Sequence, residues 1–199
     1  MRKVLKQLVG RTYLAVSGWR TEGERPAPPQ FVLIAAPHTT NWDLPVMMAL
    51  SFVYDVPIRW VGKHTLFKPP GGWLMQALGG IPIVRHERQS RVQTLAALFD
   101  EIPDLVLTVP AEGTRSRVEY WKSGFYHIAE TADVPIVCGY LDYQRRRGGF
   151  GLVIKPSGDI RADMDQIRAF YADKVGKYPE KFGPVRLREE DSEEAEAAA

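Results

Sequence analysis

The feature that most constrains the fold of this 199-residue chain is a regular alternation of short apolar runs with helix-like segments. The apolar runs have the length and composition of buried strands and occupy residues 31–36, 58–62, 81–84, 105–109, 134–143 and 150–156. The helix-like segments occupy residues 44–53, 73–78, 91–101, 124–131 and 164–174. This alternation predicts a single-domain α/β sandwich with a mixed, largely parallel sheet flanked by helices.

Composition excludes several other classes of protein. The single cysteine, Cys138, cannot form an intrachain disulfide, so the chain is not a disulfide scaffold, and a reducing compartment is favoured. Hydrophobic residues at 45% and charged residues at 25% are typical of globular proteins and argue against disorder throughout. No apolar run approaches the ~18–20 residues of a membrane-spanning helix, and the first residues lack a signal-peptide pattern.

The chain divides into three expected parts: residues 1–30, a basic amphipathic helix with a proline-rich connector; residues 31–188, the α/β domain; and residues 189–199, an acidic disordered tail. The tail holds six of the 24 acidic residues, which leaves 18 acidic against 26 basic residues in 1–188. A basic body of this kind favours anionic partners such as a phospholipid surface, a nucleic acid or a phosphorylated substrate.

Two loops carry residue types that are suited to catalysis or ligand binding, and each loop follows a predicted strand. In the first, His38 and Asp43 stand five positions apart, at the turn from strand 31–36 into the next helix. Such a turn would bring the carboxylate back to the imidazole, where it would fix the tautomer while the other ring nitrogen removes a proton from a hydroxyl. Alone, this spacing also fits an ordinary loop histidine beside an ordinary helix-start aspartate.

The second loop follows strand 105–109 and reads EGTRS, residues 112–116. Gly113 allows a close backbone approach to a ligand, and the Arg115 guanidinium suits a phosphate or carboxylate. Glu112 would orient a substrate hydroxyl or hold Arg115, and a plain polar turn with an internal ion pair stays an alternative. The histidines and Cys138 show no metal-ligand spacing, so no metal is expected.

These segments together resemble the glycerolipid acyltransferase family, of which lysophosphatidate acyltransferases are the best-known type. The resemblance covers about residues 31–141. The matching segments, in family order, are His38-x4-Asp43, KHTLFKPPGGW at 63–73, GGIPIVR at 79–85, EGTRS at 112–116, KSG at 122–124 and VPIV at 134–137. The chain departs from the family pattern on the acceptor side, with Pro37 for Asn, Val84 for Asp and Pro110-Ala111 for Phe-Pro.

The resemblance implies a glycerol-3-phosphate acyltransferase-like fold and a defined reaction. A fatty acyl chain would move from acyl-coenzyme A or acyl-carrier protein to a hydroxyl of a lysophospholipid or related polar lipid. His38 would be the general base and Asp43 its orienting partner, with direct attack by the hydroxyl, no acyl-enzyme, and no cofactor or metal. The implied substrate-binding residues are Glu112, Gly113, Thr114, Arg115, Arg85 and Lys63.

A lipid substrate predicts a peripheral protein at the cytoplasmic face of a membrane, docked on an anionic surface, with no nucleic-acid partner. Residues 1–20 are suited to docking because they combine five basic residues and no acidic one with Leu5, Leu8, Val16 and the interfacial residue Trp19. The alternative for this segment is packing against the sheet.

Two other functions stay open at this point. A lipid or thioester hydrolase would use the same His–Asp pair to activate water. A non-catalytic membrane-binding module would need only the basic helix and the core, and nothing in it would require His38 beside Asp43.

Overall fold

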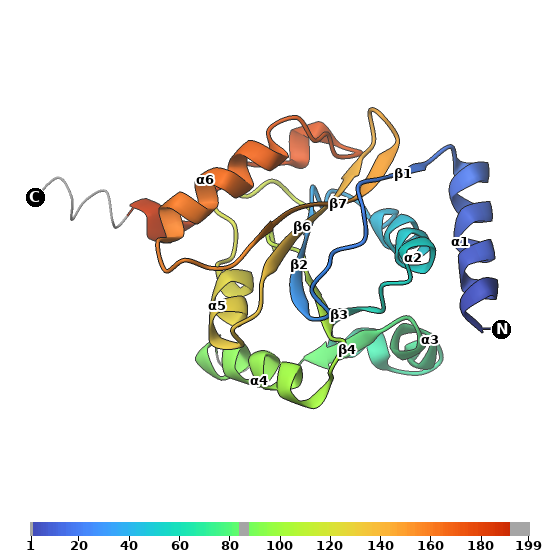
Figure 1. The fold of residues 1–199 in the computed structure, drawn as a ribbon, viewed down its shortest axis with the longest axis horizontal. Coiled ribbons are helices and arrows are strands. Elements are labelled where there is room, and N and C mark those ends of the chain that lie inside the picture. Colours follow the sequence, from blue (N-terminus) through green and yellow to red (C-terminus); the bar gives the residue numbers. More distant parts are fainter. Residues whose placement is uncertain (1, 84–87, 192–199) are drawn as a thin grey trace, which may run out of the picture.

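In the computed structural model, which describes residues 2–83 and 88–191, one seven-stranded sheet forms the centre of the molecule (Figure 1). The strands are β1 (Arg20–Glu22), β2 (Phe31–Ala36), β3 (Ile58–Lys63), β4 (Gly80–Ile83), β5 (Val106–Val109), β6 (Ile136–Asp142) and β7 (Arg147–Ile154). The helices are α1 (Arg2–Ser17), α2 (Asp43–Tyr54), α3 (Gly72–Ala77), α4 (Arg88–Glu101), α5 (Gly124–Thr131) and α6 (Ile160–Tyr171), with 3-10 turns at His64–Phe67 and Pro179–Lys181. The predicted α/β fold is confirmed.

The strands lie in the order β1-β7-β6-β2-β5-β3-β4, and β6 and β7 form an antiparallel hairpin in an otherwise parallel sheet. Strand β2 lies between β5 and β6, so that Leu33 is beside Thr108 on one side and Val137 on the other. Because these three strands run in the same direction, the loops that follow them meet at one edge of the sheet.

Side chains alternate between the two faces of the sheet, as the pleat requires. In β2, Val32 and Ile34 point into the large core that α4, α5 and α6 cover. Phe31 and Leu33 point to the opposite face, where Met47 and Met48 of α2 pack against a smaller cluster. The sheet is therefore covered on both faces, which explains why its strands read as continuous apolar runs.

Helix α1 packs on α2 rather than on the sheet (Figure 1). A Cβ atom at Gly10 would lie 2.6 Å from the carbonyl oxygen of Ala49, so the glycine allows the two helices to come close. Leu14 and Trp19 are buried on this side, and the Trp19 ring is 6% exposed. The interfacial role expected of Trp19 is therefore wrong, because its ring belongs to the interior.

Strand β1 lies within residues 1–30, where the sequence predicted a helix and a connector and no strand. It adds an edge strand to the sheet by parallel pairing with β7, with Arg20 beside Arg147. All three of its residues are exposed, and none is apolar. A strand of this kind has no hydrophobic alternation, which is the signal by which strands are found in sequences.

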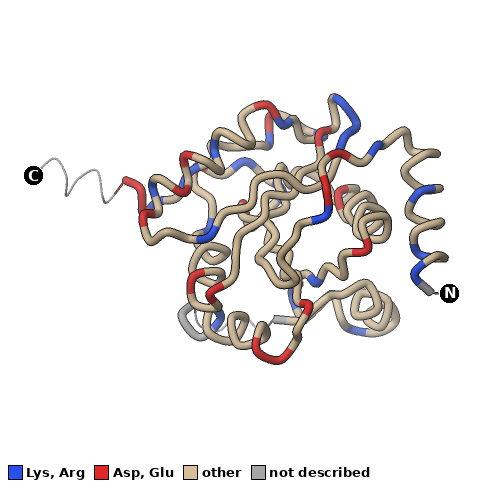
Figure 2. The backbone as a smooth tube through the Cα atoms, viewed as in Figure 1, with Lys and Arg blue, Asp and Glu red and all other residues tan. Residues whose placement is uncertain are grey.

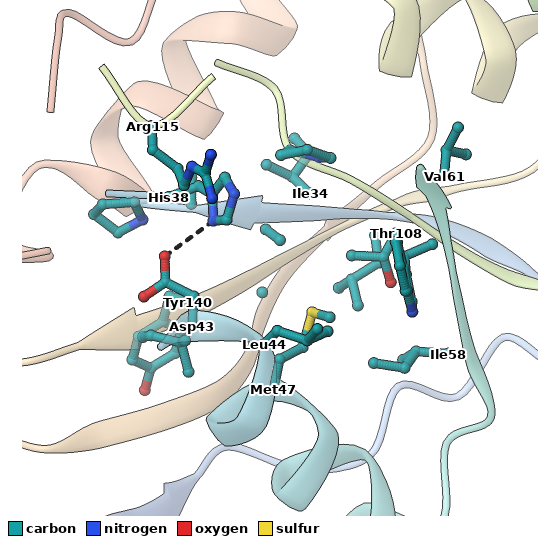
Figure 3. Close-up of a pocket in the computed structure, with 18 of the residues that line it drawn as sticks. Ile34, His38, Asp43, Leu44, Met47, Ile58, Val61, Thr108, Arg115 and Tyr140 are labelled. Carbon is teal, nitrogen blue, oxygen red and sulfur yellow. Dashed lines mark hydrogen bonds and ion pairs between the residues drawn. The ribbon is translucent and has the colours of Figure 1, made fainter. Parts of the chain in front are cut away.

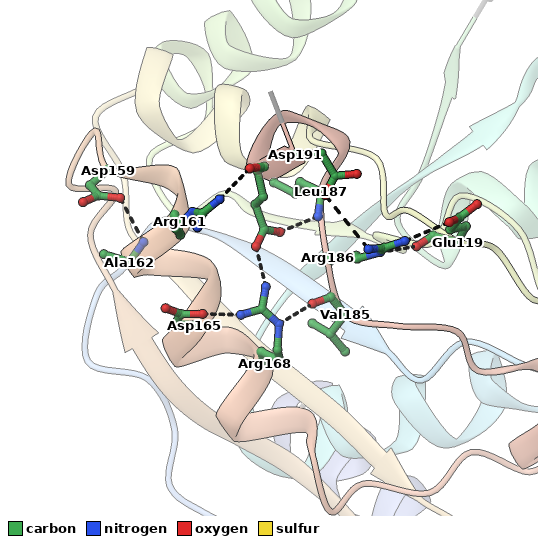
Figure 4. A network of polar contacts seen from close by, with 11 residues as sticks. Glu119, Asp159, Arg161, Ala162, Asp165, Arg168, Val185, Arg186, Leu187 and Asp191 are labelled. Carbon is green, nitrogen blue, oxygen red and sulfur yellow. Dashed lines mark hydrogen bonds and ion pairs between the residues drawn. The ribbon is translucent and has the colours of Figure 1, made fainter. Parts of the chain in front are cut away.

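The first three residues of the expected acidic tail are part of the folded body. The carboxylate of Glu190 is buried, where it accepts a hydrogen bond from the Leu187 backbone N–H at 2.5 Å and forms an ion pair with Arg168 of α6. Figure 4 labels both of these partners, Leu187 and Arg168. Glu189 accepts a hydrogen bond from the Ser123 hydroxyl at 2.6 Å. The expected boundary before Glu189 is corrected for residues 189–191, and residues 192–199 lie outside the described residues.

None of the helices in residues 2–83 and 88–191 has both the length and the apolar character needed to cross a bilayer. Lysine and arginine residues line α1 and the turn between β6 and β7 (Figure 2).

Candidate active site

His38 and Asp43 form a hydrogen-bonded pair at the carboxyl end of β2. His38 lies in the loop after the strand, Asp43 is the first residue of α2, and the His38 Nδ1 atom is 2.9 Å from Asp43 Oδ2 (Figure 3). An ionised carboxylate only accepts hydrogen bonds, so this contact places the proton on Nδ1 and leaves a lone pair on Nε2. The pairing expected from the sequence is thus present, with the imidazole in the tautomer that a general base needs.

Asp43 is held by two further donors and is 5% exposed. The Thr40 backbone N–H donates to Oδ2 at 3.2 Å, and the Tyr143 hydroxyl donates to Oδ1 at 2.8 Å. Tyr143 follows β6, the neighbour of β2, and no local pattern in the sequence pointed to it. The carboxylate has donors on both oxygens, which fixes its rotation as well as its position.

Glu112 supports the histidine loop from the opposite side. Its carboxylate oxygens lie 3.1 and 3.0 Å from the His38 backbone nitrogen, whose N–H they accept, and the residue is 2% exposed. Burial raises the pKa of the Glu112 carboxyl to about 7, although the hydrogen bond from the His38 N–H acts in the opposite direction. Glu112 therefore joins the two predicted loops to each other through the His38 backbone, and its carboxylate is not paired with Arg115.

The next three residues of the EGTRS turn, Gly113, Thr114 and Arg115, line the cavity. Gly113 has a left-handed φ of 69°, and the Thr114 hydroxyl accepts the Ser116 backbone N–H at 3.3 Å. Arg115 is exposed and extends over the same end of the cavity as His38 (Figure 3). Lys63, at the end of β3, lines this end too, and no carboxylate in the described part of the chain is paired with either cation. Arg85 lies outside the described residues.

A cavity of about 620 Å³ extends from this site between α2 and the sheet. Its deeper wall is mainly apolar and includes Leu33, Met47, Leu50, Ile58 and Phe150. Its volume is within the range of pockets that enclose most of a small ligand. A molecule with a long apolar portion would therefore place its polar end at His38 and Arg115.

A comparison with protein families identifies the family of the chain. The sequence model of the family described as Acyltransferase matches residues 19–141, which include the His38–Asp43 pair and the EGTRS turn. The chain belongs to the acyltransferase family.

The fold of this acyltransferase is similar to that of a solved relative. The crystal structure of the 1-acyl-sn-glycerophosphate (LPA) acyltransferase PlsC from Thermotoga maritima matches with a TM-score of 0.54 and 18% sequence identity. The match covers 83% of this chain and 76% of the Thermotoga chain. A comparison with curated proteins gives no significant match.

The acyltransferase has no activated thiol. Its one cysteine, Cys138, is buried in β6, and burial raises the pKa of the thiol to about 12. Within residues 2–83 and 88–191, no group of three or more His, Cys, Asp or Glu side chains is placed to hold a metal ion. The polar side chains that line the cavity include His38, Asn41, Asp43, Lys63, Thr114 and Arg115.

Proposed function

We propose that this acyltransferase moves a fatty acyl chain from an acyl thioester, carried by coenzyme A or an acyl-carrier protein, to a hydroxyl of a lysophospholipid or related polar lipid. The observation that carries the proposal is the position of the His38–Asp43 pair at the polar mouth of a deep apolar cavity. The cavity suits an acyl chain, and its mouth would place a general base and two exposed cations beside the thioester end of that chain. The name of the Thermotoga relative, a lysophosphatidate acyltransferase, agrees with this substrate class.

In the proposed reaction His38 acts as the base. Nε2 removes the proton of the acceptor hydroxyl as its oxygen bonds to the thioester carbonyl carbon, and a tetrahedral intermediate forms. The carbon–sulfur bond then breaks, and the imidazolium returns the proton to the departing thiolate. Asp43 stabilises the imidazolium through the 2.9 Å contact with Nδ1. Cys138 is not available as a nucleophile, so the acyl group passes directly between the substrates.

Arg115 and Lys63 would hold the phosphate of the acceptor. Both cations are exposed at the cavity mouth, neither has an acidic partner among residues 2–83 and 88–191, and the planar guanidinium offers two parallel hydrogen bonds to a phosphate. The phosphate would then place the glycerol hydroxyl of the lysolipid near Nε2 of His38. This arrangement leads to a direct prediction about acceptor affinity.

Replacing Arg115 by Ala should raise the acceptor KM by roughly ten- to a hundredfold, because a charge-assisted contact of ~1.5–3 kcal/mol is lost. Steady-state kinetics with lysophosphatidate should show this rise, and kinetics with monoacylglycerol, which has no phosphate, should show almost none. Arg59→Ala is the matched control, since Arg59 is an exposed arginine of β3 outside the cavity. A rise confined to the KM of the thioester would assign Arg115 to the donor phosphates instead.

The reaction class itself is tested by following both products. With palmitoyl-coenzyme A and a panel of lysolipids, we expect thiol release that depends on the acceptor, with a matching amount of diacyl lipid. The hydrolase alternative predicts thiol and free fatty acid at the same rate without acceptor. Because His38 and Asp43 would serve either reaction, only the product analysis separates the two.

We further propose that α1 docks the enzyme on an anionic membrane. The helix uses one side to pack on α2, and its other side is a stripe of exposed apolar side chains. The stripe consists of Val4, Leu5, Leu8, Val9 and Val16. Basic residues accompany it, and Trp73 and Leu74 of α3 form a second exposed apolar group. A stripe of this width beside basic residues is typical of a helix that lies in a membrane interface.

The docking proposal predicts that Leu8→Asp weakens binding to phosphatidylglycerol vesicles by about tenfold, since it removes an inserted side chain and adds a repelled charge. Vesicle sedimentation at several salt concentrations measures the effect, and binding should weaken as salt increases. Val153→Asp makes a similar change at an exposed residue of β7 and serves as the control. Point substitution is preferable to deletion of residues 1–20, because deletion would also remove the buried Leu14 and Trp19. Equal binding by Leu8→Asp and wild type would exclude docking through this stripe.

A further inference from the structure

The hydroxyl of Tyr143 contacts Asp43 from outside both predicted loops. It donates to Asp43 Oδ1 at 2.8 Å, across a separation of 100 residues in the chain. The other carboxylate oxygen, Oδ2, serves His38 and the Thr40 N–H. Tyr143 therefore occupies the oxygen that would otherwise be free to turn toward the imidazole or toward solvent.

The position of Tyr143 is itself fixed by its surroundings. Its backbone N–H donates to the carbonyl of Val175 at 2.8 Å. The turn that follows is held by the buried Asp142 carboxylate, which accepts the backbone N–H groups of Gln144 and Arg145 at 3.0 and 3.1 Å. The phenol ring thus starts from a rigid hairpin, and its hydroxyl has one direction in which to donate.

The ring of Tyr143 also contacts the end of the N-terminal helix. Trp19 lies edge-on to it, with ring centroids 4.8 Å apart and an interplanar angle of 89°. Gly18 follows the last residue of α1 and has a left-handed backbone conformation with φ 74°. The Trp19 backbone N–H donates a hydrogen bond to the Leu14 carbonyl at 2.8 Å. Trp19 is therefore part of the C-terminal cap of α1, and its ring connects that helix to the hairpin.

We infer that Tyr143 is a positioning residue for acyl transfer, because it holds the Asp43 side chain in the rotation that fixes the tautomer of His38. We also infer that Trp19 couples α1 to the Tyr143–Asp43 contact. The inference rests on the proposed function, because it assigns Tyr143 a role only if His38 is the base. The contacts run in order from α1 through Trp19, Tyr143 and Asp43 to His38. The helix that we propose to dock on the membrane is thereby two contacts away from the catalytic carboxylate.

The test is Tyr143→Phe, which removes the hydroxyl and keeps the ring against Trp19. We expect kcat to fall about tenfold, since a hydrogen bond to a charged group is lost, with the KM of each substrate nearly unchanged. Tyr13→Phe is the matched control: Tyr13 packs in the same cluster of side chains as Tyr143 but has no hydrogen bond to Asp43, and it should keep wild-type kcat.

A second measurement separates positioning from general stabilisation of the fold. In an Asp43→Asn background, Tyr143→Phe should cause little further loss of kcat, because the two residues act through one contact. Trp19→Phe should lower kcat by a smaller factor, and it should add nothing to Tyr143→Phe. Independent, multiplying effects of Tyr143→Phe and Asp43→Asn would overturn the inference.

The inference and the proposed function fail in different ways. A Tyr143→Phe enzyme with more than half of wild-type kcat, beside an inactive His38→Ala enzyme, would remove Tyr143 from the mechanism and leave the proposed function intact. An active His38→Ala enzyme would remove the function on which the inference depends.

Discussion

A His38→Ala enzyme should lose ~10²–10⁴-fold in turnover while it keeps the wild-type fold, because it has no base to take the proton of the acceptor hydroxyl. The imidazole is partly exposed at the cavity mouth, with 28% of its side-chain surface accessible, so its removal leaves no buried void. The loop itself should persist, since Glu112 binds the backbone N–H of residue 38 and not the side chain. Thiol release with saturating lysolipid measures the loss, and circular dichroism with thermal melting checks the fold.

The matched control for this variant is His127→Ala. His127 lies on α5 and contacts Glu130 at 3.6 Å, on an element that does not line the cavity. Its substitution should leave turnover within about twofold of wild type, as expected for a surface change remote from the site. If folded His38→Ala enzyme kept more than about a third of wild-type turnover, that result would falsify the general-base mechanism.

Replacing Asp43 by Asn should have the second largest effect, a loss on the order of 10²-fold or more in kcat. The amide removes the negative charge that faces the imidazolium during proton transfer. The amide has one acceptor oxygen, whereas the carboxylate has two. In the wild-type enzyme, both carboxylate oxygens accept hydrogen bonds, and the donors are His38, Thr40 and Tyr143. One of these contacts must therefore reverse or break, and the histidine tautomer is no longer fixed.

The Asp43→Asn result is checked by kcat and KM measured together. We expect the fall in kcat with small changes in both KM values, since Asp43 acts on the base and not on a substrate. Asp104→Asn, which removes an exposed carboxylate remote from the cavity, is the control for the lost charge. A variant with normal kcat and a raised acceptor KM would instead make Asp43 part of the acceptor site.

Local features of the sequence predicted the central parts of this molecule well. The His38–Asp43 contact depends on one turn of chain, and the strand and helix periodicities depend on short windows, so each is visible without knowledge of the rest of the fold. Each of the two loops was predicted to follow a strand, and in a parallel sheet the loops that follow the strands lie at the same edge. Each of these features can be predicted from residues that are close in the sequence or from a general rule of sheet topology.

The contacts that the sequence did not predict all depend on how segments that are far apart in the chain pair with one another. Glu112 was expected to orient a substrate hydroxyl or to hold Arg115, and its contact with the His38 backbone, which follows from the pairing of β2 with β5, was not foreseen. Tyr143 reaches Asp43 because β6 lies beside β2, and Trp19 is buried because α1 returns toward the β6–β7 hairpin. Residue type and local spacing do not encode these pairings, since they are set by which strands become neighbours.

The parallel arrangement of β5, β2 and β6 has a consequence for newly synthesised chains that have not finished folding. The Tyr143 hydroxyl reaches Asp43 only where β6 lies beside β2, and Glu112 reaches the His38 backbone only where β5 lies on the other side of β2. A nascent or partly folded chain without this pairing has His38 and Asp43 without these two contacts. In the proposed reaction, full turnover would therefore require the complete sheet.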